Sequence, residues 1–185
     1  IAGGVGAAPV YPQVKWLRER GVEVFREVVE RYAAVKAGVS RDGDAPKVMF
    51  NLPYQDVWYM PSDESYMVQL VEDAGGEYIY KGKNTTRGSV AINLEEAYLL
   101  VADADVWLNV GQCSTMEELR SAAPHFMTTS VVERGEVYNN NRRRTAAGGS
   151  DFWESAIVRP DVVLAELAAI MAGEAVEPCY YQQLQ

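Results

Sequence analysis

Arg142, Arg143 and Arg144 form a run of three adjacent guanidinium groups in an otherwise acidic chain. A guanidinium binds a carboxylate or a phosphate through two parallel hydrogen bonds, so this run predicts a site for an anionic ligand. It follows an expected strand at 136–138 and precedes a Gly-Gly-Ser-Asp sequence. The alternative interpretation is a solvated polar loop, because charged side chains are usually exposed to water.

Trp58 and Tyr59 lie between Val57 and Pro61, shortly after an expected strand at 47–52. Ligands of open α/β sheets bind beyond the carboxyl ends of the strands. If Trp58 and Tyr59 are exposed there, they offer a stacking surface that also carries polar groups. The alternative is a loop that packs on its own aromatic side chains.

Glu95 and Glu96 stand at the expected start of a helix, where the helix dipole favours negative charge. Paired carboxylates can act as general acid and base. Neighbouring helix positions point in different directions, however, so this pair is poorly placed for shared catalysis. A salt bridge to a partner protein is the more specific interpretation.

The residue types needed for nucleophilic or metal chemistry are scarce. The chain has one histidine, His125, and two cysteines, Cys113 and Cys179. One imidazole excludes a histidine-rich metal centre, and two thiols exclude a four-thiolate site. His125 has no acid or cysteine beside it, so we interpret it as structural or exposed. The two cysteines are compatible with a disulfide but do not require one.

Two alternative functions remain open from these residues. The first is a small α/β enzyme that uses Cys113 or the pair Glu95 and Glu96. The second is a metal-binding lobe in which Asp103 and Asp105 supply hard oxygen ligands. The spacing of these two aspartates is more typical of a turn at the start of a strand.

The composition describes an ordinary globular chain of 185 residues with a formal net charge of −9. An acidic chain is a poor general nucleic-acid binder, because phosphate binding needs a cationic surface. No stretch approaches the roughly 18 consecutive apolar residues of a membrane span. Residues 1–9 lack the cationic start of a signal peptide. We therefore expect a processed product or a piece of a longer chain.

Hydrophobic periodicity alternates between strands and helices, which predicts a layered α/β unit. Asn93 is expected to cap one helix, and Ser114 with Glu117 to form a capping box for the next. The expected strands are 47–52, 77–80, 105–110 and 136–138, and the expected helices are 13–36, 65–74, 94–102, 115–122, 152–157 and 161–172.

Charge divides the chain into two segments at a Gly/Asp/Pro stretch, residues 38–46. Residues 1–45 carry seven basic and six acidic side chains, whereas residues 46–185 carry ten basic and twenty acidic ones. A helix over 13–36 would be about 35 Å long at 1.5 Å per residue, which suits an element that connects two bodies. We therefore expect a linking segment at 1–45 and an α/β lobe at 46–185.

An ordered series of short motifs covers the second segment, in this order: Trp58–Pro61, Ser65–Tyr66, Glu72–Tyr78, Asn93–Glu95, Ala102–Trp107, Gly135–Tyr138, Gly148–Asp151 and Arg159–Asp161. The series resembles the C-terminal lobe of the substrate-binding proteins of ABC importers for iron–siderophores, haem and vitamin B12. The helix at 13–36 is similar to the long helix that joins the two lobes in that family.

The resemblance implies a three-layer α/β/α lobe with a central, mostly parallel sheet, preceded by the inter-lobe helix. It implies a periplasmic protein or a lipid-anchored lipoprotein of the cell envelope that performs no chemistry and needs no cofactor. Such a protein captures a metal chelate between two lobes and delivers it to a membrane permease. The N-terminal lobe of the family has no counterpart in this sequence, so we expect a C-terminal piece.

The resemblance also assigns residues by matched position. Trp58 and Tyr59 fall on one loop of the ligand cleft, and Arg142–Arg144 fall near a second one. Glu95 matches an acid that pairs with arginines of the permease. The sequence does not choose among a ferric siderophore, haem and a corrinoid such as cobalamin, although three arginines favour an anionic ligand.

Overall fold

A five-stranded sheet organises the chain. The computed structural model describes residues 23–40, 43–146, 148–174 and 179–185. The strand order is β3-β1-β5-β6-β7, in which the first four strands are parallel and β7 runs antiparallel to β6. The strands are β1 (Lys47–Phe50), β3 (Glu77–Tyr78), β5 (Val106–Leu108), β6 (Val137–Asn139) and β7 (Gln182–Gln183).

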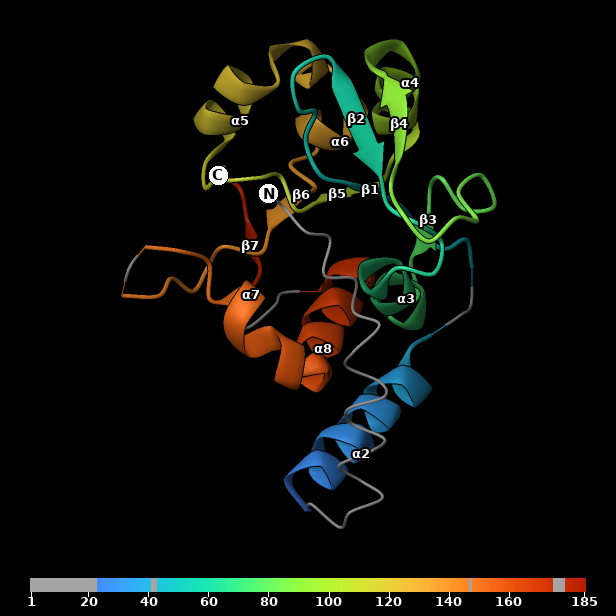
Figure 1. Cartoon of the computed structure of the whole chain (residues 1–185), viewed down its shortest axis with the longest axis vertical. Helices are drawn as coiled ribbons and strands as arrows, with labels where there is room; N and C mark the ends of the chain where they lie inside the picture. The colour runs from blue at the N-terminus through green and yellow to red at the C-terminus, as the bar shows by residue number, and fades with distance from the viewer. Residues whose placement is uncertain (1–22, 41–42, 147, 175–178) are drawn as a thin grey trace.

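Helices cover both faces of this sheet (Figure 1). On one face lie α3 (Tyr66–Asp73), α7 (Phe152–Ser155), the 3₁₀ turn η2 (Ala156–Val158) and α8 (Pro160–Met171); toward the other lie α4 (Leu94–Asp103), α5 (Met116–Ala122), the 3₁₀ turn η1 (Pro124–Phe126) and α6 (Ser130–Glu133). A small antiparallel sheet of β2 (Val57–Met60) and β4 (Val90–Asn93) lies beside α4. The expected three-layer α/β/α lobe is therefore confirmed.

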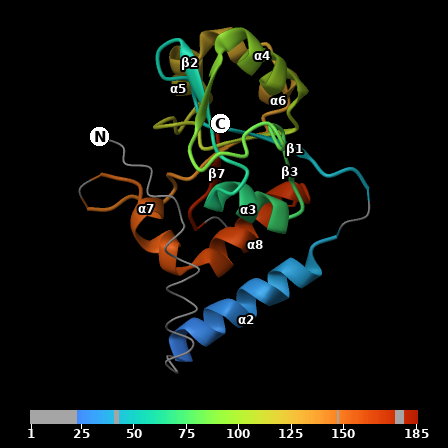
Figure 2. The same ribbon diagram turned by 45° about the vertical axis from the view of Figure 1, so that its right-hand side comes forward.

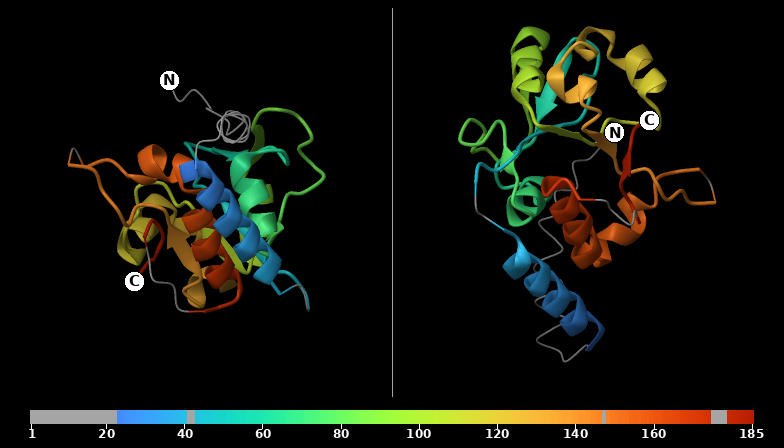
Figure 3. Two further views of the ribbon diagram at one scale, coloured as in Figure 1. Left: turned by 90° about the horizontal axis from the view of Figure 1, so that it is seen from below. Right: turned by 180° about the vertical axis from the view of Figure 1, so that it is seen from behind.

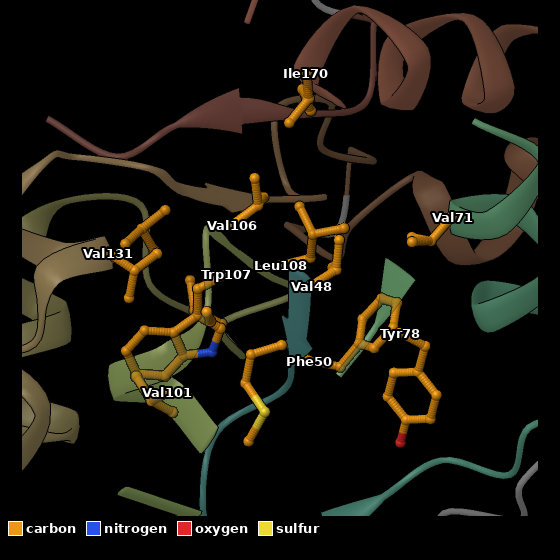
Figure 4. Close-up of a cluster of buried hydrophobic side chains, with 14 of the residues drawn as sticks. Val48, Phe50, Val71, Tyr78, Val101, Val106, Trp107, Leu108, Val131 and Ile170 are labelled. Carbon is orange, nitrogen blue, oxygen red and sulfur yellow. The ribbon is translucent and has the colours of Figure 1, made fainter. Parts of the chain in front are cut away.

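The core lies on both sides of the central sheet (Figure 4). Ile170 of α8 packs toward one face, and Val101 of α4 toward the other, with Val106 and Trp107 of β5 pointing to opposite sides between them. All three residues of β5 are buried, as expected for a parallel strand that is covered twice.

The strand order creates a switch point at β1 and β5. From β1 the chain crosses through α3 to β3 on one side, and the later strands add on the other side. In open α/β sheets the crevice outside the carboxyl ends of two such neighbouring strands is where ligands bind. The fold therefore directs attention to the loops that follow β1, β5 and β6.

The helix α2 (Glu23–Gly38) lies against α8, outside the three layers (Figures 2 and 3). Arg31 of α2 forms a 2.7 Å ion pair with Asp161, whose side chain is 3% exposed. The hydroxyl of Tyr32 donates to Asp73 at 2.7 Å, and the Lys36 ammonium lies 2.6 Å from the same carboxylate. Two carboxylates of the lobe thus hold α2 in place. The expected residues 13–22 of this helix lie outside the described residues.

Most of the expected elements form, with three differences. The side chain of Thr115, rather than Ser114, caps α5 by accepting from the backbone N–H of Glu118 at 3.2 Å. The Ser114 hydroxyl instead accepts hydrogen bonds from Arg144 and Asn141. The helix cap therefore lies one residue later in the chain than the sequence predicted. The segment after β1 forms β2 rather than a loop, and β4, β7 and α6 were not expected from the sequence.

Asp161→Asn should destabilise the lobe in a pH-dependent way. Burial by itself would raise the pKa of Asp161, but hydrogen bonds and charge from Arg159 and Arg31 outweigh it and hold that pKa below its ordinary value of 3.8. The carboxylate therefore stabilises the fold above pH 3.8, and this contribution is lost as the pH falls through the lower folded-state pKa. We expect a loss of about 1–2 kcal/mol at pH 7, since both guanidinium groups stay half exposed.

Urea unfolding of wild type and variant at pH 7 and in steps down to about pH 2 measures this difference. Asp103→Asn is the matched control, because Asp103 pairs with Lys47 in an exposed ion pair. A difference between wild type and Asp161→Asn that is the same at every pH would contradict the role of the Asp161 charge.

Candidate ligand-binding edge and partner surface

We define the carboxyl edge of the sheet as the loops at 51–56, 109–115 and 140–151, which follow β1, β5 and β6. Asn51 and Asn109 begin the first two loops with φ angles of 70° and 62°. Asparagine tolerates this left-handed conformation better than most residues. Sequence reasoning missed both residues, and an asparagine placed directly after each of two apolar runs was the signal available.

Long-range hydrogen bonds hold these two asparagines. The indole N–H of Trp107 donates to the Asn51 carbonyl at 2.7 Å, and the Tyr181 hydroxyl donates to the Asn109 side-chain oxygen at 3.1 Å. The backbone N–H of Asn109 donates to the Tyr138 carbonyl at 3.0 Å. The beginnings of both loops are therefore tied to neighbouring strands before any ligand arrives.

Trp58 is a core residue. Its side chain is fully buried, and its indole N–H donates to the Phe50 carbonyl at 2.8 Å. Its ring lies 5.7 Å from Trp107 and 5.3 Å from Phe126. The expectation that Trp58 offers an exposed stacking surface is wrong, because pairing of β2 with β4 turns this residue inward.

Tyr59, the next residue along β2, points outward with 46% of its surface exposed. Tyr54, in the loop after β1, is 69% exposed and sits in a tight turn closed by hydrogen bonds with Val57. Two phenol rings are therefore accessible to solvent near the end of β1. The ligand-binding role of Tyr59 remains a prediction.

Two of the three adjacent arginines bind within the protein. Arg143 lies 3.1 Å from the Asp151 carboxylate, and its guanidinium lies over the Tyr180 ring at 5.7 Å. Arg144 donates to the Ser114 hydroxyl at 2.9 Å. These contacts close the 140–151 loop and tie it to the 109–115 loop.

The three asparagines before the arginines support the same loop from inside. Asn139, Asn140 and Asn141 are all buried. The side-chain amides of Asn139 and Asn141 both donate to the Cys113 carbonyl, at 2.7 and 3.1 Å. The base of the arginine loop is therefore a hydrogen-bonded core element rather than a solvated loop.

Arg142 is different from its two neighbours. Its backbone N–H donates to the Tyr180 carbonyl at 3.0 Å, which anchors the residue. Its side chain is exposed and makes no hydrogen bond or ion pair within the part of the chain that the structure describes. Of the three arginines, Arg142 is the one whose guanidinium is available to a ligand.

Glu95 lies on a separate surface, at the start of α4. The Asn93 side chain caps this helix by accepting from the backbone N–H of Glu96 at 2.8 Å. Burial raises the pKa of the Tyr80 hydroxyl, and the charge and hydrogen bond of Glu96 raise it further. Glu96 therefore has a partner within the lobe, whereas Glu95 is exposed and has none among the described residues.

Apolar side chains flank Glu95 on the exposed surface of α4. Leu94, Tyr98 and Leu99 lie around it, and the last two are 38% and 69% exposed. A carboxylate framed by exposed apolar side chains has the composition of a protein contact surface.

The alternative functions find little support in the geometry. Cys113 is buried, and burial raises the pKa of its thiol, which disfavours the reactive thiolate. Both Cys113 and Cys179 are free thiols. Glu95 and Glu96 have different surroundings, since Glu96 contacts the Tyr80 hydroxyl and Glu95 is exposed. His125 is exposed on η1.

The two aspartates considered as metal ligands are engaged elsewhere. Asp103 lies 2.7 Å from the Lys47 ammonium, and Asp105 accepts the backbone N–H of Lys47 at 2.9 Å. Within the described residues, no group of three or more His, Cys, Asp or Glu side chains is arranged to hold a metal ion. The expected turn at the start of the strand is the better description of this pair.

Comparison with known proteins identifies the class. A model of the periplasmic binding protein family matches residues 17–146, and the chain belongs to this family. The family comprises substrate-binding proteins of ABC transporters, in agreement with the motif series. An uncharacterized lipoprotein of Methanocaldococcus jannaschii is 28% identical over 140 residues, which are 74% of this chain and 32% of that protein.

Two solved structures illustrate the shared fold. A periplasmic haem-binding protein from Pseudomonas aeruginosa superimposes with a TM-score of 0.61 at 16% identity, over 97% of this chain and 64% of its own. The triscatecholate siderophore-binding protein of Bacillus subtilis, solved with ferri-bacillibactin, gives a TM-score of 0.55 at 14% identity, over 82% of this chain and 53% of its own. The chain thus spans about a third of the lipoprotein and less than two thirds of either structure.

None of the helices in the described ranges is both long and apolar enough to cross a bilayer.

The burial of Trp58 leads to a stability prediction. Trp58→Phe removes the N–H that satisfies the Phe50 carbonyl and leaves space beside Trp107 and Phe126. We expect the free energy of unfolding to fall by about 2 kcal/mol. Tyr59→Phe on the outer face of β2 is the matched control and should change it by less than about 0.5 kcal/mol. Equal stabilities for the two variants in urea unfolding would contradict the core role of Trp58.

Proposed function

We propose that this chain is the C-terminal lobe and linking helix of a substrate-binding protein that captures an anionic metal chelate for an ABC importer. Residues 1–45 supply the linking segment, and residues 46–185 form one wall of a ligand cleft completed by a first lobe. The observation that carries the proposal is the exposed guanidinium of Arg142, which has no polar partner among the described residues, on the carboxyl edge of a doubly wound sheet.

Charge supports an anionic ligand. The lobe at 46–185 carries twice as many acidic as basic side chains, so its surface repels anions in general. Arg142, on a loop held by hydrogen bonds, therefore places a positive charge on this acidic surface, and an anionic group can bind its guanidinium through two hydrogen bonds. Ferric siderophores, haem and corrinoids are the ligand classes under consideration, and the outward-facing ring of Tyr59 would contact a flat or bulky one.

The docking of α2 supports the two-lobed organisation. Arg31, Tyr32 and Lys36 attach the helix to buried or half-buried carboxylates of the lobe. A helix held in this way would transmit the position of one lobe to the other as a rigid element. This arrangement favours a cleft of nearly constant geometry over a large hinge motion.

The α4 surface supports a membrane partner. We propose that Glu95 pairs with a cation of the permease, and that the exposed apolar side chains of Tyr98 and Leu99 beside it contact the adjoining surface. The protein would then work in the periplasm or at the outer face of the cell membrane. The lipoprotein relative supports attachment through a lipid anchor.

Arg142→Ala tests the ligand site. In the full-length protein we expect it to lower the affinity for an anionic chelate about tenfold or more, the usual size of a lost charge-assisted hydrogen bond. Equilibrium dialysis with a ferric tris-catecholate, haem and cobalamin measures the affinities. Arg134→Ala is the control, because Arg134 lies 3.7 Å from Asp105, the residue directly before β5, and therefore stands at the opposite, amino edge of the sheet.

The outcomes separate two failures. If the folded wild type binds none of the three compounds, the transport function proposed here is wrong for these ligand classes. If it binds one of them and Arg142→Ala binds equally well, the position of the site is wrong.

Glu95→Arg tests the partner surface. We expect unchanged ligand affinity but a loss of about tenfold in the stimulation of ATP hydrolysis by the cognate permease complex in proteoliposomes, because the variant places like charges opposite each other. Glu117→Arg is the matched control, since Glu117 is also an exposed acid in the first turn of a helix. Equal effects of the two substitutions would argue against a specific role for Glu95.

A further inference from the structure

Trp153 is the exposed tryptophan of the described residues. It is 67% exposed, whereas Trp58 and Trp107 are fully buried. Ile157 and Val158, one turn further along, are 38% and 49% exposed, so the indole lies on an apolar face. An exposed indole of this size is costly to leave in water and calls for a functional explanation.

A rigid base holds the Trp153 ring in place. The neighbouring Phe152 is buried, and the two rings meet edge to face at 5.1 Å and 86°. Phe152 in turn packs edge to face on Tyr180 and Tyr181, both at 5.8 Å. A ring that is supported in this way needs little reorganisation to receive a ligand.

Trp153 and Arg142 stand at opposite ends of one loop. The loop between β6 and α7 projects from the side of the lobe (Figure 1), and pairing of Arg144 with Ser150 brings its two arms together. The backbone N–H of Trp153 donates to the Ser150 carbonyl at 3.4 Å. Arg142 at the start of this closed loop and Trp153 in the first turn of α7 therefore flank the same closed segment.

Tyr180 connects the two ends from inside. Its carbonyl accepts the backbone N–H of Arg142 at 3.0 Å, and its ring packs on Phe152, the support of Trp153. Arg143, which lies over the same Tyr180 ring and pairs with Asp151, makes the connection rigid. Arg142 and Trp153 thus share one supporting residue.

We propose that Trp153 and Arg142 together bind a planar conjugated ring that carries negative charge. The ring stacks on the exposed face of the indole while the guanidinium pairs with an anionic oxygen of the ligand. A catecholate siderophore and a tetrapyrrole with carboxylate groups share this chemistry, whereas a hydroxamate chelate without aromatic rings does not. This inference rests on the proposed function and assigns to Trp153 the stacking role that the buried Trp58 cannot perform.

Affinity measurements on Trp153 variants of the full-length protein test the inference. We expect Trp153→Ala to weaken binding of a ferric tris-catecholate or of haem about tenfold, and Trp153→Phe to retain most of the affinity because phenylalanine also stacks. Binding of ferric desferrioxamine, a hydroxamate chelate, should be weak and independent of residue 153. Equilibrium dialysis gives the dissociation constants, and circular dichroism with thermal unfolding confirms that each variant folds.

Leu99→Ala is the matched control, because Leu99 is exposed to a similar extent but lies on α4. If this control weakens binding as much as Trp153→Ala does, or if Trp153→Ala stays within twofold of wild type, the inference is overturned. A protein that binds the hydroxamate chelate best, or that depends on Trp153 equally for all three chelates, overturns the ligand class proposed here. A folded wild type that binds none of them contradicts the proposed transport function itself, and the inference with it.

Discussion

Two buried indole N–H groups donate to consecutive carbonyls at the end of β1, Trp58 to Phe50 at 2.8 Å and Trp107 to Asn51 at 2.7 Å. A buried carbonyl without a partner destabilises a fold, so the chain can leave the sheet here only where such donors are supplied. Trp58 brings β2 against the sheet, and Trp107 belongs to the neighbouring β5. This pair of hydrogen bonds therefore helps to determine where the 51–56 loop starts and which face of β2 is outward.

Buried carbonyl groups also need hydrogen-bond donors in the rest of the carboxyl edge, the loops at 109–115 and 140–151. Asn139 and Asn141 satisfy the Cys113 carbonyl from inside, and Arg143 and Arg144 bind Asp151 and Ser114. Internal contacts use most of the polar groups that the sequence places there. What remains on the outside is Arg142 and the adjoining aromatic surface, a small set on a rigid support. Such preorganisation lowers the cost of binding.

The attachment of α2 follows a different principle. Its polar side chains meet Asp73 and Asp161 on α3 and α8, away from the carboxyl edge. α2 therefore joins the lobe through ion pairs and a hydrogen bond behind the sheet and does not cover the loops at 51–56, 109–115 and 140–151. In a two-lobed protein this arrangement would allow a second lobe to face those loops.

Local sequence determined much of this protein. Asn93 caps its helix as expected, the apolar runs at 47–50 and 106–108 form the central strands, and the motif series identified the family, because each of these signals depends on residues close together in the chain. Only the tertiary structure decided which predicted site residues face solvent. Trp58 turns inward because β2 pairs with β4 more than thirty positions away, and Arg144 is occupied by Ser114 at a separation of 30 residues. For the same reason Glu96 contacts Tyr80, whereas Arg142 and Glu95 have no polar side-chain partner among the described residues. Burial and pairing over such separations depend on how the layers pack, and no local pattern in the sequence records that packing.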